Sequence, residues 1–115
     1  DELRVVDDQV GCPTWTGHLA PALVELAESP ARGVFHVASA GRCSWFELAR
    51  AAIEPAGLEC AVEPATTGEF PRPAPRPAFS VLATERPGET PRLPSWQDGL
   101  AAYLAQRAAR TEVTT

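Results

Sequence analysis

Two arginines in a proline-rich stretch carry the side chains of this sequence best suited to bind an anion. Arg72 and Arg76 lie within Glu-Phe-Pro-Arg-Pro-Ala-Pro-Arg-Pro, residues 69–77. A guanidinium group can direct several donors at phosphate oxygens, and the surrounding prolines lower the entropy lost when the loop becomes ordered. The pair can therefore bind a pyrophosphate, while surface or helix-end salt bridges explain the same two residues equally well.

Three further side chains have both a binding and a structural explanation. Gln9 and Thr14 flank a Gly-Cys-Pro turn, where they can hydrogen-bond to a sugar or a cofactor, or can stabilise the turn itself. Trp45 can stack on a base or a sugar, or it can anchor the start of a helix in the core. His36 lies in an apolar run, so we expect a hydrogen-bonded core histidine.

The missing residue types exclude several kinds of chemistry. All ten basic residues are arginine, so there is no Schiff-base lysine, no P-loop lysine and no Tyr-x-x-x-Lys pair. We expect the single tyrosine, Tyr103, to pack on a helix face, and the eight glycines form no cofactor-binding fingerprint. There is also no methionine, so we expect an excised or processed segment.

Length and charge narrow the class of protein. A chain of 115 residues suits one small domain. A net charge of -5 and a pI near 4.9 argue against nucleic-acid binding, which normally requires a basic surface. No apolar run approaches the ~20 residues that cross a bilayer, so we expect no membrane partner and a cytoplasmic location. The three widely spaced cysteines suit reduced thiols better than a disulfide framework or a metal site.

The first half of the chain predicts the elements that position the amide, hydroxyl and indole groups. Val5-Val6 indicates a strand that runs into the turn, and Thr14 or Thr16 can cap a following helix that ends at Ser29-Pro30. Val34–Ala38 indicates a short strand covered on both faces, as in a parallel sheet.

The second half begins with a strong helix signal. Ser44-Trp45-Phe46-Glu47 is a capping box, and the helix should run to about Ala56 and close at Gly57 in the left-handed conformation. Residues 60–63 predict a short strand.

Most of the twelve prolines lie between residues 64 and 94. Disorder is one interpretation of this stretch, but its apolar residues favour an ordered loop: Phe70, Phe79, Val81 and Leu82. Ser95 can cap a last helix, and residues 111–115 should fray.

Three segments together resemble a known family. They are residues 5–14, residues 33–38 leading to 43–49, and residues 69–82. In order and spacing they resemble the C-terminal portion of the dTDP-4-dehydrorhamnose reductases, which are extended short-chain dehydrogenases/reductases, over roughly residues 4–104. The first segment carries the pattern V-V-D-D-Q-x-G-x-P-T.

The resemblance implies an α/β segment with about three helices, two or three short strands and the proline-rich loop. Residues 1–110 would form the substrate-binding segment, without the N-terminal Rossmann domain that binds most of the NADPH in the intact enzyme. That enzyme reduces dTDP-4-dehydro-L-rhamnose to dTDP-L-rhamnose. The candidate substrate-binding residues are Gln9, Thr14, Trp45, Arg72 and Arg76.

With the catalytic Tyr-x-x-x-Lys and the cofactor turn missing, the chain alone should be inactive and should bind no cofactor. We also expect self-association through the exposed edge of the Val34–Ala38 strand. Two alternatives remain open. One is a non-catalytic regulatory protein of the same fold family, such as the regulatory subunit of methionine adenosyltransferase. The other is a different extended short-chain epimerase or reductase.

Overall fold

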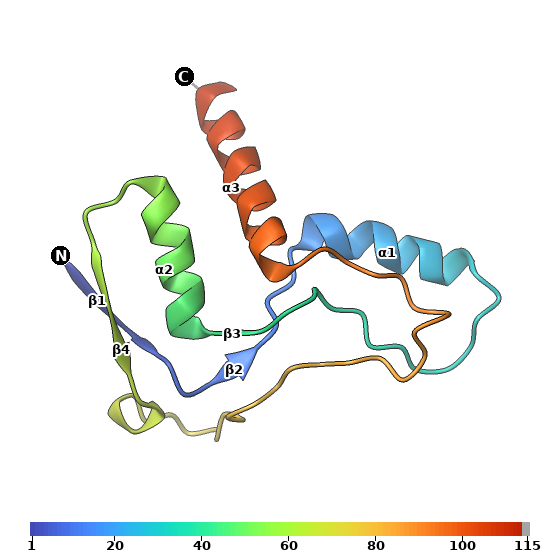
Figure 1. Ribbon diagram of the computed structural model, residues 1–115, viewed down its shortest axis with the longest axis horizontal. Coiled ribbons are helices and arrows are strands. Elements are labelled where there is room, and N and C mark those ends of the chain that lie inside the picture. The colour runs from blue at the N-terminus through green and yellow to red at the C-terminus, as the bar shows by residue number, and fades with distance from the viewer. Residues whose placement is uncertain (114–115) are drawn as a thin grey trace. The chain divides into compact units, whose positions relative to one another are not determined.

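The structure is a computed structural model that describes residues 1–113. Its chain divides into two compact units that alternate along the sequence. The first unit comprises Asp1–Gly11 and Arg42–Val81, and the second comprises Cys12–Gly41 and Leu82–Thr115. Figure 1 labels the elements along the chain.

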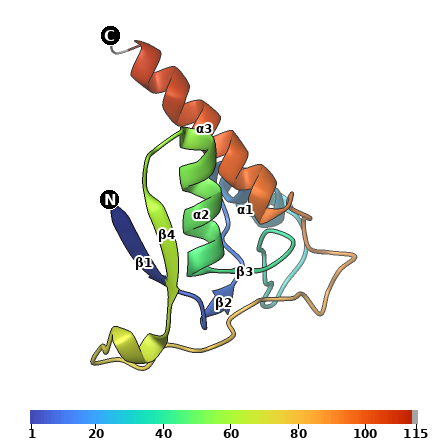
Figure 2. The ribbon, with the colours of Figure 1, turned by 60° about the vertical axis from the view of Figure 1, so that its left-hand side comes forward.

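A parallel strand pair with one helix forms the framework of the first unit. β1 (Glu2–Val6) pairs with β4 (Ala61–Ala65), from Glu2 opposite Ala61 to Val6 opposite Ala65. Parallel neighbours need a crossover connection, and α2 (Trp45–Ala56) lies in that connection and packs against both strands (Figures 1 and 2). The α/β fold class predicted from the sequence is confirmed, with three helices and four short strands among the described residues.

A second small sheet extends from the end of β1. β2 (Val10–Gly11) pairs antiparallel with β3 (Cys43–Ser44), which directly precedes α2. On its other side Val10 forms a parallel bridge with Phe79. Two distant segments are therefore fixed to one short stretch of backbone.

The N-terminal capping box of α2 is confirmed. The Ser44 hydroxyl accepts from the Glu47 amide at 3.1 Å, and the Glu47 carboxylate accepts from the Ser44 amide at 3.0 Å. Gly57 closes the helix in the left-handed conformation with φ of 68°, as predicted. The predicted strand at residues 60–63 corresponds to β4, which continues through Pro64 because that residue lies in a strand paired on one side only.

The second unit is built on α1 (Thr16–Glu28) and α3 (Trp96–Val113), which pack against each other. Ser95 caps α3 as predicted, accepting from the Asp98 amide at 3.1 Å. The helix still includes residues 111–113, and the rest of the predicted frayed tail, residues 114–115, lies outside the described residues.

The predicted cap of α1 is wrong. The N-cap residue is Trp15, whose side chain makes no capping bond. The Thr14 hydroxyl instead donates to the Cys12 carbonyl at 3.2 Å and accepts from the Ser39 amide at 3.1 Å. The Thr14 hydroxyl is therefore already used by one local contact, to Cys12, and one long-range contact, to Ser39. The predicted end of the helix is correct, since Ser29 is the C-cap residue.

The predicted strand at Val34–Ala38 is also wrong. None of these residues belongs to a strand, Val34 is 81% exposed, and His36 is exposed with its Nδ1 3.1 Å from the Ala83 carbonyl. The self-association predicted from the edge of this strand loses its basis.

Side-chain contacts from Arg86 hold this segment in place of strand pairing. Its guanidinium donates to the Arg32 carbonyl and to both carboxylate oxygens of Glu89, and it lies 4.1 Å from the centre of the Phe35 ring. One residue of the apolar run, Phe35, therefore packs against a cation instead of pairing in a sheet.

The proline-rich stretch is largely irregular backbone, and three of the four apolar residues that favoured an ordered loop are exposed: Phe70, Phe79 and Leu82. Between β4 and α3 the described chain has one short helical turn, η1 (Thr67–Glu69), and otherwise irregular backbone. Among residues 1–113, no helix is both long and apolar enough to span a membrane.

Candidate functional site

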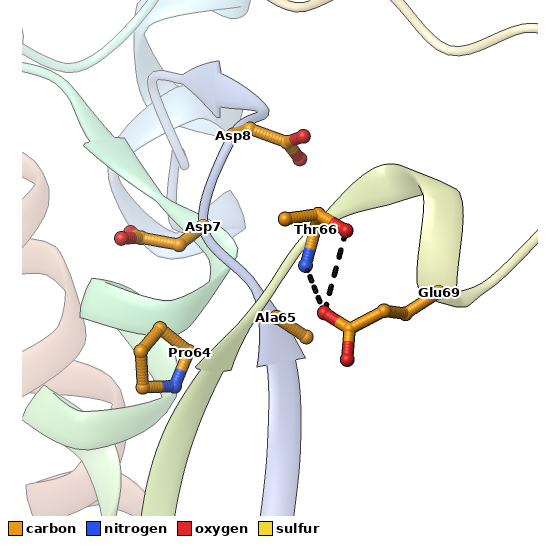
Figure 3. A pocket seen from close by; sticks show the side chains of 6 residues that line it. All are labelled: Asp7, Asp8, Pro64, Ala65, Thr66 and Glu69. Atoms are coloured by element: carbon orange, nitrogen blue, oxygen red, sulfur yellow. Dashed lines mark hydrogen bonds between the residues drawn. The ribbon is translucent and has the colours of Figure 1, made fainter.

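Asp7 and Asp8, directly after β1, direct their carboxylates to opposite sides of the chain (Figure 3). Successive residues of extended backbone alternate in this way. Asp7 accepts a 2.6 Å hydrogen bond from the Ser44 hydroxyl at the start of α2. Asp8 points toward η1, so the pair connects β1 with two different segments of the first unit.

Asp8 holds the start of η1. Both of its carboxylate oxygens accept from the Thr67 amide at 3.0 Å, and Oδ1 also accepts from the Thr67 hydroxyl at 2.6 Å. The hydroxyl bond and then the amide bond from Thr67 hold the pKa of Asp8 below its ordinary value, because they stabilise the charged form. The Gln9 side-chain amide donates to the same hydroxyl oxygen at 3.2 Å.

Glu69, the last residue of η1, reaches back to its N-cap, Thr66, and also to β1. Its Oε2 accepts from the Thr66 amide at 2.7 Å, and its Oε1 forms a 2.5 Å ion pair with Arg4 of β1. The Thr66 amide bond, followed by the charge of Arg4, lowers the pKa of Glu69. The carboxylates of Asp8 and Glu69 therefore already have hydrogen-bonding partners within the protein.

The chain after η1 forms what we call the arginine loop, residues 70–78, which carries Arg72 and Arg76. It begins directly after Glu69 and ends where the Val10 amide donates to the Ala78 carbonyl at 2.9 Å. The Ser80 amide returns a 2.8 Å bond to the Val10 carbonyl. Both ends of the loop are thus tied to the residues that follow β1.

Both arginines are exposed. Within residues 1–113, neither guanidinium has an ion-pair or hydrogen-bond partner. The salt bridges that offered the structural explanation for Arg72 and Arg76 are therefore not formed, and both groups are open to an anion.

Two exposed aromatic side chains lie on the segments that flank Val10. Trp45, the first residue of α2, is 56% exposed, so its ring is not a buried anchor. Phe79 is 57% exposed, and the Arg42 guanidinium lies 5.7 Å from its ring centre. No local pattern in the sequence predicts this Arg42–Phe79 pair, because only long-range backbone pairing brings the two residues together.

An open pocket of about 300 Å³ lies at the carboxyl ends of β1 and β4. Its lining residues, drawn in Figure 3, are Asp7, Asp8, Pro64, Ala65, Thr66 and Glu69. Three carboxylates give it a negative charge that disfavours a phosphate. Among the described residues, no group of three or more His, Cys, Asp or Glu side chains is arranged to hold a metal ion.

Comparison with known proteins decides the family. The family model described as the RmlD substrate binding domain matches residues 1–109. The chain belongs to this family. It is a substrate-binding domain of the kind found in dTDP-4-dehydrorhamnose reductases, as the resemblance in the sequence predicted.

The relatives of this substrate-binding domain are longer proteins. The spore coat polysaccharide biosynthesis protein SpsK of Bacillus subtilis is 46% identical over 111 residues, which cover 94% of this chain and 38% of that protein. The dTDP-4-dehydrorhamnose reductase of Mycobacterium tuberculosis is 43% identical over 114 residues, covering 95% of this chain and 37% of the enzyme. The chain therefore spans less than two fifths of the length of these curated relatives.

A solved structure has the same fold. The crystal structure of the Bacillus anthracis dTDP-4-dehydrorhamnose reductase, in complex with NADP, matches with a TM-score of 0.86 and 33% identity. The match covers 92% of this chain and 38% of that enzyme. This agrees with the predicted fold class, a segment of an extended short-chain dehydrogenase/reductase.

The five candidate residues divide between the two units of this substrate-binding domain. Gln9, Trp45, Arg72 and Arg76 belong to the first unit, and Thr14 belongs to the second. Thr14 makes the turn contact to Cys12 and Gln9 bonds Thr67 of η1, while the two arginines and Trp45 keep exposed functional groups. A role in substrate binding stays a prediction for all five.

Proposed function

We propose that this chain is the sugar-nucleotide-binding part of an NADPH-dependent dTDP-4-dehydrorhamnose reductase, with residues 1–110 as its binding segment. The observation that carries the proposal is the match of a substrate-binding family over residues 1–109. The exposed, unpartnered arginines of the arginine loop support it, because a dTDP-sugar presents a doubly charged pyrophosphate.

In this proposal the candidate residues contact different parts of the substrate. Arg72 and Arg76 bind the pyrophosphate through charge-assisted hydrogen bonds. Trp45 stacks on the base or the sugar. Gln9 supplies a hydrogen bond to the sugar, and Thr14, which belongs to the second unit, stays a separate candidate for substrate binding.

The residues of this chain do not fit the NADPH of the proposed enzyme. The sequence has no lysine and no glycine-rich cofactor turn. The pocket at the carboxyl ends of β1 and β4 is lined by three carboxylates, which would repel the cofactor pyrophosphate. We therefore assign the cofactor to an N-terminal Rossmann domain.

A chimera tests the proposed function. The matching segment of the Mycobacterium tuberculosis reductase, which is 43% identical, is replaced by this chain. We expect the chimera to oxidise NADPH with dTDP-4-dehydro-L-rhamnose, and we expect the 115-residue chain alone not to do so.

Arginine variants of the chimera test the site. Arg72→Gln combined with Arg76→Gln should raise KM about tenfold or more, since each lost charge-assisted bond is worth about 1.5–3 kcal/mol before solvent replaces it. Arg92→Gln, at an exposed arginine outside the arginine loop, is the matched control and should leave KM unchanged. A folded chimera without activity would refute the proposed function and favour a non-catalytic role.

A further inference from the structure

We propose that Asp8 is a positioning residue that, through Thr67, fixes the arginine loop and keeps Arg72 and Arg76 available to the substrate phosphates. This inference rests on the proposed function, because it concerns the same binding site. It assigns to the second aspartate of the Asp7-Asp8 pair a role that neither charge nor sequence position suggests, since an acidic side chain would be expected to oppose anion binding.

The contact between Asp8 and Thr67 joins the turn after β1 to the start of η1 through a charged acceptor. It consists of a 2.6 Å bond from the hydroxyl and a bifurcated 3.0 Å bond from the amide, across 59 positions of sequence. Gln9 adds a 3.2 Å bond to the same hydroxyl oxygen. Charged acceptors make the stronger hydrogen bonds, so Asp8 contributes more to this link than Gln9 does.

The far end of the arginine loop is tied to the same turn. Val10 exchanges backbone hydrogen bonds with Ala78 and Ser80, at 2.9 and 2.8 Å. Asp8 and the Arg4–Glu69 ion pair therefore hold the start of the loop, and Val10 holds its end. A loop fixed at both ends loses less conformational entropy when its side chains bind a ligand, which increases affinity without a new contact.

The same hydrogen bonds remove two competitors for the arginines. Asp8 is occupied by Thr67, and Glu69 is occupied by Arg4 and the Thr66 amide. Neither carboxylate forms an ion pair with Arg72 or Arg76. The acidic residues at the base of the loop are thus already hydrogen-bonded or ion-paired within the protein, while the arginines stay unpaired and can bind an anion.

The framework of the first unit does not depend on Asp8. Its hydrogen-bonding partner is Thr67 of η1, whereas β1, β4 and α2 are held by strand pairing and the Ser44 capping box. Loss of the Asp8 carboxylate should therefore loosen the arginine loop and leave the fold in place.

The experiment measures binding of dTDP and of inorganic pyrophosphate to the 115-residue chain by isothermal titration calorimetry. Asp8→Asn and Thr67→Val should each weaken dTDP binding about tenfold, as expected when two long side chains must be ordered on binding. Arg92→Gln is the control, and far-UV circular dichroism with chemical denaturation reports whether each variant is folded.

A double-mutant cycle separates positioning from general stability. In a background with Arg72→Gln and Arg76→Gln, Asp8→Asn should have no further effect on dTDP affinity, because it acts through the arginines. Equal effects in both backgrounds would overturn the inference. So would a folded Asp8→Asn variant that binds dTDP as tightly as the wild type. If the folded wild-type chain binds neither dTDP nor pyrophosphate, the phosphate site of the proposed function fails as well. If the wild type binds dTDP and the Asp8→Asn variant binds it equally tightly, only the positioning role of Asp8 fails.

Discussion

The Ser44 hydroxyl donates a 2.6 Å hydrogen bond to Oδ1 of Asp7, which lies 37 positions earlier in the sequence. The same oxygen accepts the Glu47 amide in the capping box of α2. Ser44 is 1% exposed, so water cannot replace either of the two hydrogen bonds at its hydroxyl. One hydroxyl therefore fixes the start of α2 to the end of β1.

Ser44→Ala should destabilise the chain by about 1–3 kcal/mol. The range combines the usual loss of an N-cap with a hydrogen bond to a charged acceptor, reduced because Asp7 is exposed and regains water. Urea denaturation monitored by circular dichroism measures the change. Equal stability of the variant and the wild type would contradict a role for both contacts.

Ser44→Asp should also destabilise the chain, although aspartate is normally a good N-cap residue. The new carboxylate would lie within hydrogen-bonding distance of Asp7, and two like charges there repel each other. Adding Asp7→Asn should recover part of the lost stability. A Ser44→Asp variant as stable as the wild type would show that Asp7 turns away.

The anchors of the arginine loop should weaken in acid. The pKa values of Asp8 and Glu69 are lowered in the folded chain, so their stabilising contribution is present above their unfolded pKa values. It is lost as the pH falls through the lower, folded pKa values. Thr67→Val should raise the pKa of Asp8 toward its ordinary value, because it removes the hydroxyl that lowers it most.

Carboxyl chemical shifts, followed by NMR between pH 2 and 6, measure both pKa values. Glu69 serves as the internal control for Thr67→Val, since its lowered pKa depends first on the Thr66 amide and then on Arg4. An unchanged Asp8 titration in that variant would contradict the hydrogen bond between the two side chains.

Local signals in the sequence were sufficient for both ends of α2, although not for the start of α1. The capping box of α2 and the glycine that closes it involve residues within a few positions of each other, and both were predicted correctly. The family resemblance was also carried by short motifs. The contacts that form the candidate site join residues far apart, such as Asp8 and Thr67, and no local pattern encodes them.

The absence of the predicted strand at Val34–Ala38 has a specific physical explanation. Val34–Ala38 has the composition of a covered strand, but a strand also needs a neighbour to receive its backbone hydrogen bonds. In this chain Arg86 contacts Phe35 instead, and the identity of that partner cannot be read from the apolar run.

Gly57→Ala should cost about 1 kcal/mol, the usual penalty for a side chain in the left-handed conformation. Gly57 has φ of 68°, and an added Cβ would meet no atom within 4 Å, so the cost is purely conformational. Gly88→Ala is the matched control, since Gly88 also has open space and its φ is not positive. Thermal denaturation compares the two, and an equal loss in both would refute the conformational explanation.

Arg86→Lys should destabilise the second unit by about 1–2 kcal/mol, because lysine cannot reproduce the planar guanidinium fork or its stacking. The guanidinium contacts Arg32, Phe35 and Glu89 at once, and the ion pair alone is partly exposed and contributes little. Glu89→Gln, which removes that ion pair's charge and keeps the stacking on Phe35, should therefore cost less than Arg86→Lys. Hydrogen exchange of the amides of residues 32–37 provides a local measurement. Faster exchange in Arg86→Lys than in Glu89→Gln is expected, and equal exchange would show that Arg86 does not hold this segment.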